Sequence, residues 1–253
     1  MTIVDRGSGM PLVLIPGLQG RWEYMRDTVE ALAPFFRVIT FSLEGSDYDS
    51  YAGQVAAALN TAGVERAVVC GVSFGGLIAV RFASRFPARC ATLVLASTPQ
   101  PALTLRPRHR VYLRMPWLLG PLFLAETPFR VRRELRAAMS EPAARRQFSW
   151  NALRTLLGAP VSLNAMAARA RLATTDAVVA DCMRITAPTL VVTGEAHLDY
   201  VVPVEGSAEY LRLIPNARRM VLASTGHLGS MTRPREFAAM VRAFVEEHRD
   251  AAA

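Results

Sequence analysis

One pentapeptide of the chain, residues 71–75 (Gly-Val-Ser-Phe-Gly), has the pattern G-x-S-x-G. A nucleophilic serine on a tight turn between a strand and a helix needs small neighbours, because the chain must bend sharply to expose the hydroxyl. The run 67–70 before it is typical of a buried strand, and the run 76–80 after it is typical of a buried helix. We predict Ser73 as a nucleophile; the alternative is a structural Gly-Ser turn in a Rossmann-like sheet.

A nucleophilic serine needs a base, and the chain has four histidines. His227 follows the predicted strand 220–222, and open α/β sheets build their sites in loops at the carboxyl ends of strands. His109 lies in an arginine cluster that would lower its basicity, and His248 is near the end of a helical segment, where a cation complements the helix dipole. His197 is interpreted as a solvated loop residue. We predict His227 as the general base.

The base needs an acid to hold its tautomer, and two carboxylates follow the apolar run 189–192. Asp199 precedes a small apolar turn and Pro203, which would hold it rigidly. Glu195 is the alternative. The order Ser73, Asp199, His227 along the chain favours a triad with Asp199 as the acid.

The first strong apolar run ends in a glycine turn at residues 15–20 (Ile-Pro-Gly-Leu-Gln-Gly). Such a turn would present the backbone N–H of Leu18 toward Ser73, beside the N–H of Phe74. Two N–H groups of this kind can stabilise the negative charge that develops on a carbonyl oxygen during nucleophilic attack. We predict Leu18 and Phe74 as an oxyanion hole, with an ordinary strand-to-helix turn as the alternative.

The elements that must hold these residues alternate between strand and helix patterns. Short, nearly continuous apolar runs are typical of strands buried on both faces of a parallel sheet. They occur at 12–15, 38–41, 67–70 and 92–95, and further strand patterns follow at 189–192 and 219–222. Helix patterns follow them, among them a last amphipathic segment with Phe237, Met240, Val241, Phe244 and Val245 on one face. We predict a doubly wound, mostly parallel α/β sheet.

The alternation stops at about Pro99 and resumes at about Ile185. Between them the chain has arginine-rich helical patterns interrupted by prolines. All 29 basic residues of the protein are arginines, and residues 101–182 hold 13 of them against five acidic residues. This segment therefore carries the whole net charge of +8. An anionic or carrier-linked substrate would explain the excess, and a solvated surface is the equal alternative.

The composition excludes several classes. Half of the residues are hydrophobic and a fifth are charged, as in globular proteins, and no apolar run is long enough for a membrane span. Cys70, Cys90 and Cys182 are odd in number and widely spaced, which indicates reduced, buried thiols rather than disulfides or a metal site. We predict a soluble, cytoplasmic protein without a cofactor or metal, and no nucleic-acid-binding module accompanies the basic charge.

These motifs resemble those of the α/β-hydrolase fold family, in particular its lidded serine esterases, lactonases and C–C hydrolases. The resemblance covers residues 8–100 and 185–250, and it implies roles for Ser73, Asp199, His227 and the amides of Leu18 and Phe74. A family member with aspartate in place of Ser73 would be a dehalogenase or epoxide hydrolase, so the serine argues against both. The N-terminus is short, so the leading antiparallel strands are expected to be reduced or absent.

The resemblance further implies a hydrolase core formed by residues 1–99 and 185–253 and a helical insertion, here called the cap, at residues 100–184. Large apolar side chains of the cap are expected to form mostly its own core and partly a substrate pocket; they are Trp117, Leu118, Phe123, Phe129, Phe148 and Trp150.

The predicted activity is hydrolysis of a carboxylic ester, lactone or thioester through an acyl-enzyme. Acyl transfer or C–C bond hydrolysis with the same triad, and a non-catalytic binding protein on this scaffold, are the alternatives.

Overall fold

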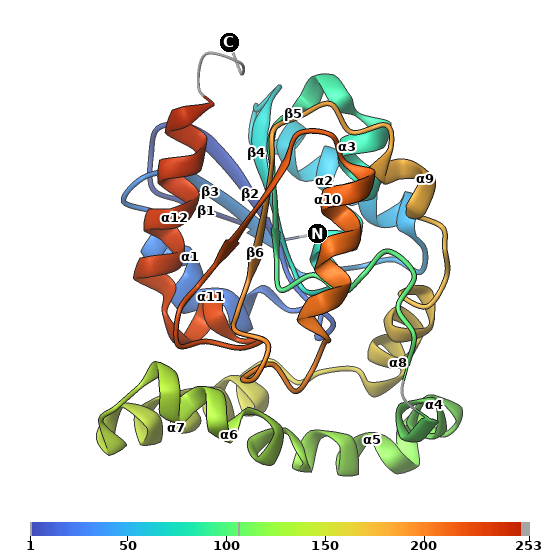
Figure 1. Ribbon diagram of the computed structural model, residues 1–253, viewed down its shortest axis with the longest axis vertical. Helices are drawn as coiled ribbons and strands as arrows, with labels where there is room; N and C mark the ends of the chain where they lie inside the picture. The colour runs from blue at the N-terminus through green and yellow to red at the C-terminus, as the bar shows by residue number, and fades with distance from the viewer. Residues whose placement is uncertain (1, 106, 249–253) are drawn as a thin grey trace.

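The computed structural model describes residues 2–105 and 107–248. A seven-stranded sheet with the order β1-β3-β2-β4-β5-β6-β7 forms its centre (Figure 1). The strands are β1 (Ile3–Arg6), β2 (Pro11–Ile15), β3 (Arg37–Phe41), β4 (Ala67–Val72), β5 (Cys90–Ala96), β6 (Thr189–Thr193) and β7 (Ala217–Val221). β1 is antiparallel to β3 and all other pairings are parallel. The predicted doubly wound sheet is confirmed, with its antiparallel part reduced to one short edge strand.

Helices cover both faces of this sheet (Figure 1). α1 (Arg26–Leu32) and α12 (Pro234–Glu247) lie on one face, and α2 (Tyr48–Thr61), α3 (Phe74–Arg85) and α10 (Ala208–Leu213) lie on the other. The shorter elements are η1 (Trp22–Met25), η2 (Pro87–Arg89), η3 (Val204–Ser207), α9 (Val179–Cys182) and α11 (Gly229–Thr232). Because both faces are covered, β4 and β5 are buried over their whole length, which is why they consist almost entirely of apolar residues.

The three cysteines lie inside these layers. Cys70, Cys90 and Cys182 are all buried and unpaired, as the sequence predicts. Burial raises the pKa of each thiol to about 12, so none is a reactive thiolate at neutral pH.

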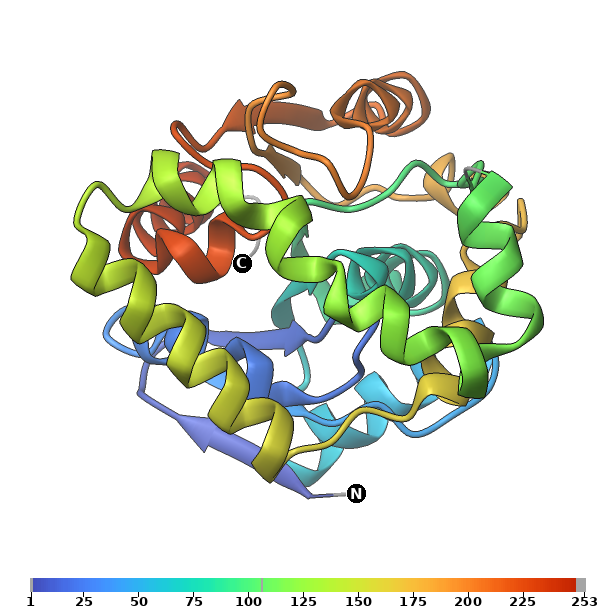
Figure 2. The ribbon, with the colours of Figure 1, turned by 90° about the horizontal axis from the view of Figure 1, so that it is seen from below.

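Five helices of the described part of the cap precede α9, the short helix at its end before β6. They are α4 (Pro107–Arg114), α5 (Pro116–Ala125), α6 (Thr127–Ala138), α7 (Pro142–Gly158) and α8 (Leu163–Leu172). They lie across the end of the sheet where the parallel strands finish, and seen from below α5, α6 and α7 frame that end (Figure 2). None of the described helices is long and apolar enough to cross a membrane.

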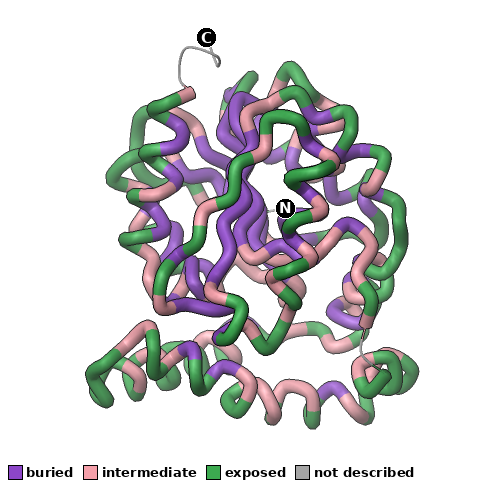
Figure 3. The backbone as a smooth tube through the Cα atoms, in the orientation of Figure 1, coloured by how far each residue is buried: buried purple, intermediate pink, exposed green. Residues whose placement is uncertain are grey.

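The cap does not bury its large apolar side chains as expected. Trp117, Phe129 and Trp150 are 67%, 74% and 57% exposed, and Leu118 is also exposed, while Phe123 and Phe148 are half-buried. The prediction that most of these residues form a core of the cap is therefore wrong. α5, α6 and α7 form a single layer over the core, and a single layer leaves one face of each helix to solvent (Figure 3).

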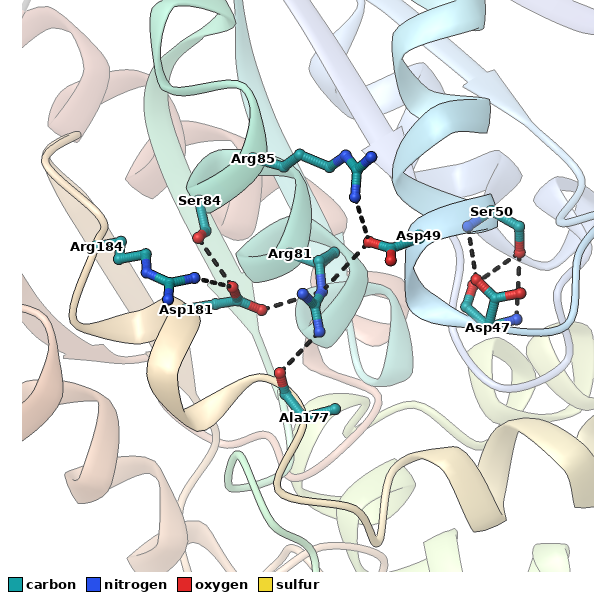
Figure 4. Close-up of polar contacts among 9 residues, drawn as sticks. All are labelled: Asp47, Asp49, Ser50, Arg81, Ser84, Arg85, Ala177, Asp181 and Arg184. Atoms are coloured by element: carbon teal, nitrogen blue, oxygen red, sulfur yellow. Dashed lines mark hydrogen bonds and ion pairs between the residues drawn. The ribbon is translucent and has the colours of Figure 1, made fainter.

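The chain that returns from the cap to the sheet is fixed to α3 (Figure 4). Arg81 of α3 donates a hydrogen bond to the carbonyl oxygen of Ala177 at 2.8 Å, and its Nε lies 3.0 Å from a carboxylate oxygen of Asp181. Ser84, one turn further along α3, donates to the other oxygen of the buried Asp181 at 2.9 Å. The helix that follows Ser73 therefore also holds the C-terminal end of the insertion.

Candidate active site

Ser73 lies on the turn that joins β4 to α3. Its φ of 53° and ψ of −123° are unusual for a residue with a side chain. Gly71 and Gly75 are required for this turn, because a Cβ atom on Gly71 would lie 2.3 Å from the carbonyl oxygen of Gly75. A Cβ atom on Gly75 would lie 2.3 Å from the carbonyl oxygen of Ile15, at the end of β2. Both glycines of the pattern therefore have a steric reason, and the predicted strand–turn–helix context is present.

His227 reaches Ser73 from the loop that follows β7. Its Nε2 lies 3.1 Å from Oγ of Ser73, within hydrogen-bond distance. The two residues are 154 positions apart in the sequence. The imidazole is almost completely buried, so water does not compete freely for its nitrogens.

Asp199 lies behind His227, in the loop after β6. Its Oδ2 is 3.4 Å from Nδ1 of His227, longer than a well-formed hydrogen bond, and both side chains are buried. Its Oδ1 accepts hydrogen bonds from the backbone N–H groups of Val201 and Val202, each at 2.9 Å. Burial would raise the pKa of Asp199, but His227 and these N–H groups lower it below its ordinary value. The carboxylate is therefore ionised and rigidly oriented toward the imidazole.

Two glycines allow the acid and histidine loops to approach each other this closely. A Cβ atom on Gly226 would lie 2.5 Å from the carbonyl oxygen of Leu198 and 3.0 Å from the backbone nitrogen of Asp199. A Cβ atom on Gly194 would lie 2.4 Å from the carbonyl oxygen of Gly226. Any side chain at either glycine would separate the loops and draw Asp199 away from His227.

The other candidates of the two loops lie elsewhere. Glu195 accepts a hydrogen bond from the backbone N–H of Ser224 at 2.7 Å, so it braces the histidine loop rather than facing Nδ1 of His227. His197 is exposed, with Nδ1 at 3.5 Å from Glu195. His109 packs against Phe123 in the cap, and His248 packs on Phe244 in α12.

The turn predicted to carry the oxyanion hole lies beside Ser73. A Cβ atom on Gly17 would be 3.3 Å from Cβ of Ser73. Leu18 follows Gly17, and the N–H of Gly20 closes the turn on the carbonyl oxygen of Gly17 at 2.9 Å. Phe74 is the first residue of α3, where a backbone N–H has no partner within the helix. The structure thus brings the Leu18 turn, Phe74 and Ser73 together.

A cap residue that sequence analysis did not single out also reaches this site. Glu134 of α6 is 1% exposed, and its carboxylate accepts a hydrogen bond from the N–H of Leu228 at 2.8 Å, next to His227. Burial raises the pKa of Glu134 to about 7, against the opposing effect of the Gly226 N–H, of His227 and of the Leu228 N–H. Glu134 follows the apolar Val131 by three positions, so the two side chains lie on the same face of α6, and both are buried. This spacing is the one feature of the sequence that indicates an inward-facing Glu134.

The two carboxylates together determine the charge state of the imidazole. Burial disfavours the protonated imidazole, but Asp199 and then Glu134 outweigh it and raise the pKa of His227 above its ordinary value. A histidine in this environment can take up a proton from Ser73 and keep it while a bond is made or broken. In the part of the chain that the structure describes, no group of three or more His, Cys, Asp or Glu side chains could hold a metal ion.

Comparison with known proteins gives one consistent result. Residues 10–234 match the family model described as the alpha/beta hydrolase fold. A pimeloyl-[acyl-carrier protein] methyl ester esterase of Vibrio parahaemolyticus is 27% identical over 257 residues, covering 95% of this chain and 96% of the relative.

Solved structures with the same fold are more distant in sequence. A bromoperoxidase from Bacillus anthracis superposes with a TM-score of 0.78 at 22% identity, covering 96% of this chain and 94% of the other. The enol-lactonase of Burkholderia xenovorans LB400 gives a TM-score of 0.75 at 21% identity, covering 97% of this chain and 96% of the other.

Proposed function

Because the chain belongs to the alpha/beta hydrolase fold family, we propose that it is a serine hydrolase of carboxylic esters with Ser73, His227 and Asp199 as its catalytic triad. The observation that carries this proposal is the 3.1 Å contact between Nε2 of His227 and Oγ of Ser73 on a strained turn. The related esterase from Vibrio parahaemolyticus supports the choice of an ester as substrate.

In the proposed mechanism, Ser73 attacks the carbonyl carbon while His227 removes the hydroxyl proton. Asp199 stabilises the imidazolium that forms, and the N–H groups of Leu18 and Phe74 bind the oxyanion of the tetrahedral intermediate. His227 then donates the proton to the leaving alcohol, leaving an acyl group on Ser73. Water, activated by His227, releases the acid and restores the free serine.

The direct test is turnover of short p-nitrophenyl esters, together with mass spectrometry of the protein after treatment with a fluorophosphonate probe. We expect hydrolysis and a single adduct on Ser73. Identification of the products separates hydrolysis from acyl transfer and from C–C bond cleavage, which would use the same residues. No turnover and no adduct would overturn the proposal and favour a binding protein.

The pH dependence of kcat/KM tests the role of Glu134. His227 must be neutral to act as base, so activity rises as pH increases through the pKa of His227. The pKa of Glu134 is itself about 7, and to the extent that Glu134 is ionised it raises the pKa of His227; Glu134→Gln removes this charge but keeps an oxygen for the N–H of Leu228. We expect the acidic limb of the profile to move to lower pH in Glu134→Gln and to stay in place in Glu141→Gln, a variant at an exposed glutamate of the cap. If the acidic limb of the Glu134→Gln profile stays at the wild-type pH, Glu134 has no influence on the pKa of His227 during catalysis.

The basic charge of the cap supports an anionic or carrier-linked ester as the substrate. An open hollow of about 480 Å³ beside α4 and α8 is lined by leucines, by two threonines and by Arg110, Arg114 and Arg171, and none of Ser73, Asp199 and His227 lines it. Its guanidinium groups suit a phosphate or carboxylate of the substrate rather than the ester group that reacts at Ser73. The Vibrio relative is named for an ester of this kind, linked to an acyl-carrier protein.

Salt dependence tests this substrate class. Between about 20 and 500 mM salt, kcat/KM for a methyl ester of an acyl group carried on CoA or on an acyl-carrier protein should fall, because exposed charges are screened beyond about 10 Å at 0.1 M. A neutral ester of the same acyl length should change little. Replacing Arg110 and Arg114 by Gln should reduce kcat/KM for the anionic ester. It should also make this kcat/KM depend less steeply on the salt concentration. The same change at Arg219 and Arg235, two exposed arginines of the core, should have neither effect. Equal slopes for both esters would leave a neutral ester as the substrate.

A further inference from the structure

One arginine of the cap differs from its neighbours because its side chain leaves the surface. Arg169 lies on α8 and is 5% exposed, whereas Arg171, two residues further along the same helix, is exposed. A buried guanidinium is costly unless its N–H groups are satisfied. The contacts that satisfy Arg169 therefore indicate what the residue does.

The guanidinium of Arg169 donates to acceptors on three separate segments of the core. Nη1 donates to the carbonyl oxygens of Leu18 at 3.1 Å and Gln19 at 3.2 Å. Nη2 donates to the carbonyl oxygen of Leu43 at 3.1 Å, and Nε donates to the hydroxyl of Tyr51 at 3.1 Å. All four acceptors are neutral: three are carbonyl oxygens and one is a hydroxyl group. Their dipoles stabilise the positive charge of the guanidinium, but none of them carries a negative charge that would neutralise it.

Two of these carbonyl groups belong to the turn beside Ser73. Residues 17–20 form this turn, closed by the hydrogen bond from the Gly20 N–H to the Gly17 carbonyl oxygen. The Leu18 carbonyl belongs to its central peptide group, so a donor on that oxygen fixes how this peptide is rotated. The N–H of Leu18 belongs to the preceding peptide group, whose Gly17 carbonyl oxygen accepts the N–H of Gly20, so a contact that holds the turn in shape also holds this N–H.

The turn is built to receive the guanidinium. Gly20 has a φ of +71°, and a Cβ atom there would lie 2.3 Å from Nη1 of Arg169. The Gly20 carbonyl oxygen also accepts the N–H of Leu43 at 2.7 Å, which ties the turn to the loop after β3. Arg169 bonds to both segments and therefore joins them.

We propose that Arg169 is a positioning residue that fixes the turn at residues 17–20 so that the Leu18 N–H faces the oxyanion above Ser73. This inference rests on the proposed hydrolase function. The cap thereby supplies part of the machinery that stabilises the transition state, in addition to covering the site. No ion pair is found for Arg169 among the described residues, and its Nη1 bonds to the carbonyl oxygen of Leu18, so its positive charge also adds a favourable potential for negative charge on the substrate oxygen.

The test compares Arg169→Met and Arg169→Lys with Arg154→Met, the same change at an exposed arginine of α7 in the cap. Loss of one oxyanion donor lowers kcat by about 10²–10³-fold. We expect Arg169→Met to approach that loss with KM changed less than about threefold, since the interaction is made mainly in the transition state. Arg169→Lys keeps the charge but not the planar fork of donors, so an intermediate kcat is expected. Arg154→Met should behave as wild type.

A second measurement separates positioning from a general loss of stability. Affinity for a boronic acid inhibitor, whose adduct with Ser73 imitates the tetrahedral intermediate, should fall in parallel with kcat/KM across the three variants, at a temperature where each is folded. A kcat for Arg169→Met within threefold of wild type, or a lower melting temperature with unchanged inhibitor affinity, would overturn the proposal.

The proposed function fails if the wild-type protein neither hydrolyses esters nor reacts with a fluorophosphonate. Hydrogen–deuterium exchange then still tests whether Arg169 holds the turn, because it requires no catalytic activity. Arg169→Met should then still accelerate exchange in peptides covering residues 17–20, while Arg154→Met should not. Unchanged exchange would remove Arg169 from any role in holding this turn.

Discussion

Replacing Ser73 by alanine is expected to abolish ester hydrolysis, with kcat falling by about 10⁴–10⁶-fold. The variant removes only Oγ, the atom that lies 3.1 Å from Nε2 of His227. The backbone N–H of residue 73 still bonds to the carbonyl oxygen of Ala96 at 2.8 Å, so the turn keeps its support. Initial rates with a p-nitrophenyl ester, together with circular dichroism to verify folding, measure the effect.

The control for this variant is Ser149→Ala, which removes a hydroxyl from an exposed position of α7. It should keep full activity and full labelling by a fluorophosphonate. Labelling of Ser73→Ala at a similar rate to wild type would mean that another residue is the nucleophile. Residual hydrolysis far above the background rate would lead to the same conclusion.

The parts of the site that depend on local backbone geometry could be predicted from the sequence. Gly71 and Gly75 appear in the motif because main-chain atoms lie where their side chains would be. The loops that hold Asp199 and His227 could be located because each follows a predicted strand, and parallel strands all end at one edge of the sheet. The strand before Asp199 is buried, whereas β7, the strand before His227, is a largely exposed edge strand. Local patterns of this kind depend little on how the remaining chain is packed.

The contributions of the cap could not be predicted, because they depend on how helices without a strand partner dock on the core. Glu134 is surrounded in the sequence by arginines and looks like part of a solvated face, yet α6 turns it toward the histidine loop. Arg169 looks like one more surface arginine, and only the packing of α8 brings it to the Leu18 turn. The same uncertainty explains the wrong expectation for Trp117 and Phe129, which belong to a single helical layer with an open face.

The second large effect is expected for a substitution of Asp199, which tests whether Asp199 or Glu195 is the acid of the triad. Oδ1 accepts two backbone N–H bonds, from Val201 and Val202, and an asparagine would keep its oxygen there. Its amide NH₂ would then replace Oδ2 and point at Nδ1 of His227. Because an NH₂ group only donates, Nδ1 would have to accept, and the imidazole proton would move to Nε2. That nitrogen could no longer accept the proton of Ser73.

We therefore expect Asp199→Asn to lower kcat by about 10⁴-fold, the loss associated with a base held in the wrong tautomer. Glu195→Gln is the matched control, because Glu195 lies in the same loop but accepts the N–H of Ser224, a bond that glutamine can keep. Its kcat should stay within a few-fold of wild type. The two variants are compared in single-turnover acylation and in steady state, at a pH above the acidic limb. If Asp199→Asn remains active while Glu195→Gln loses activity, Glu195 is the acid, and the loop after β6 must rearrange on substrate binding to bring it to His227.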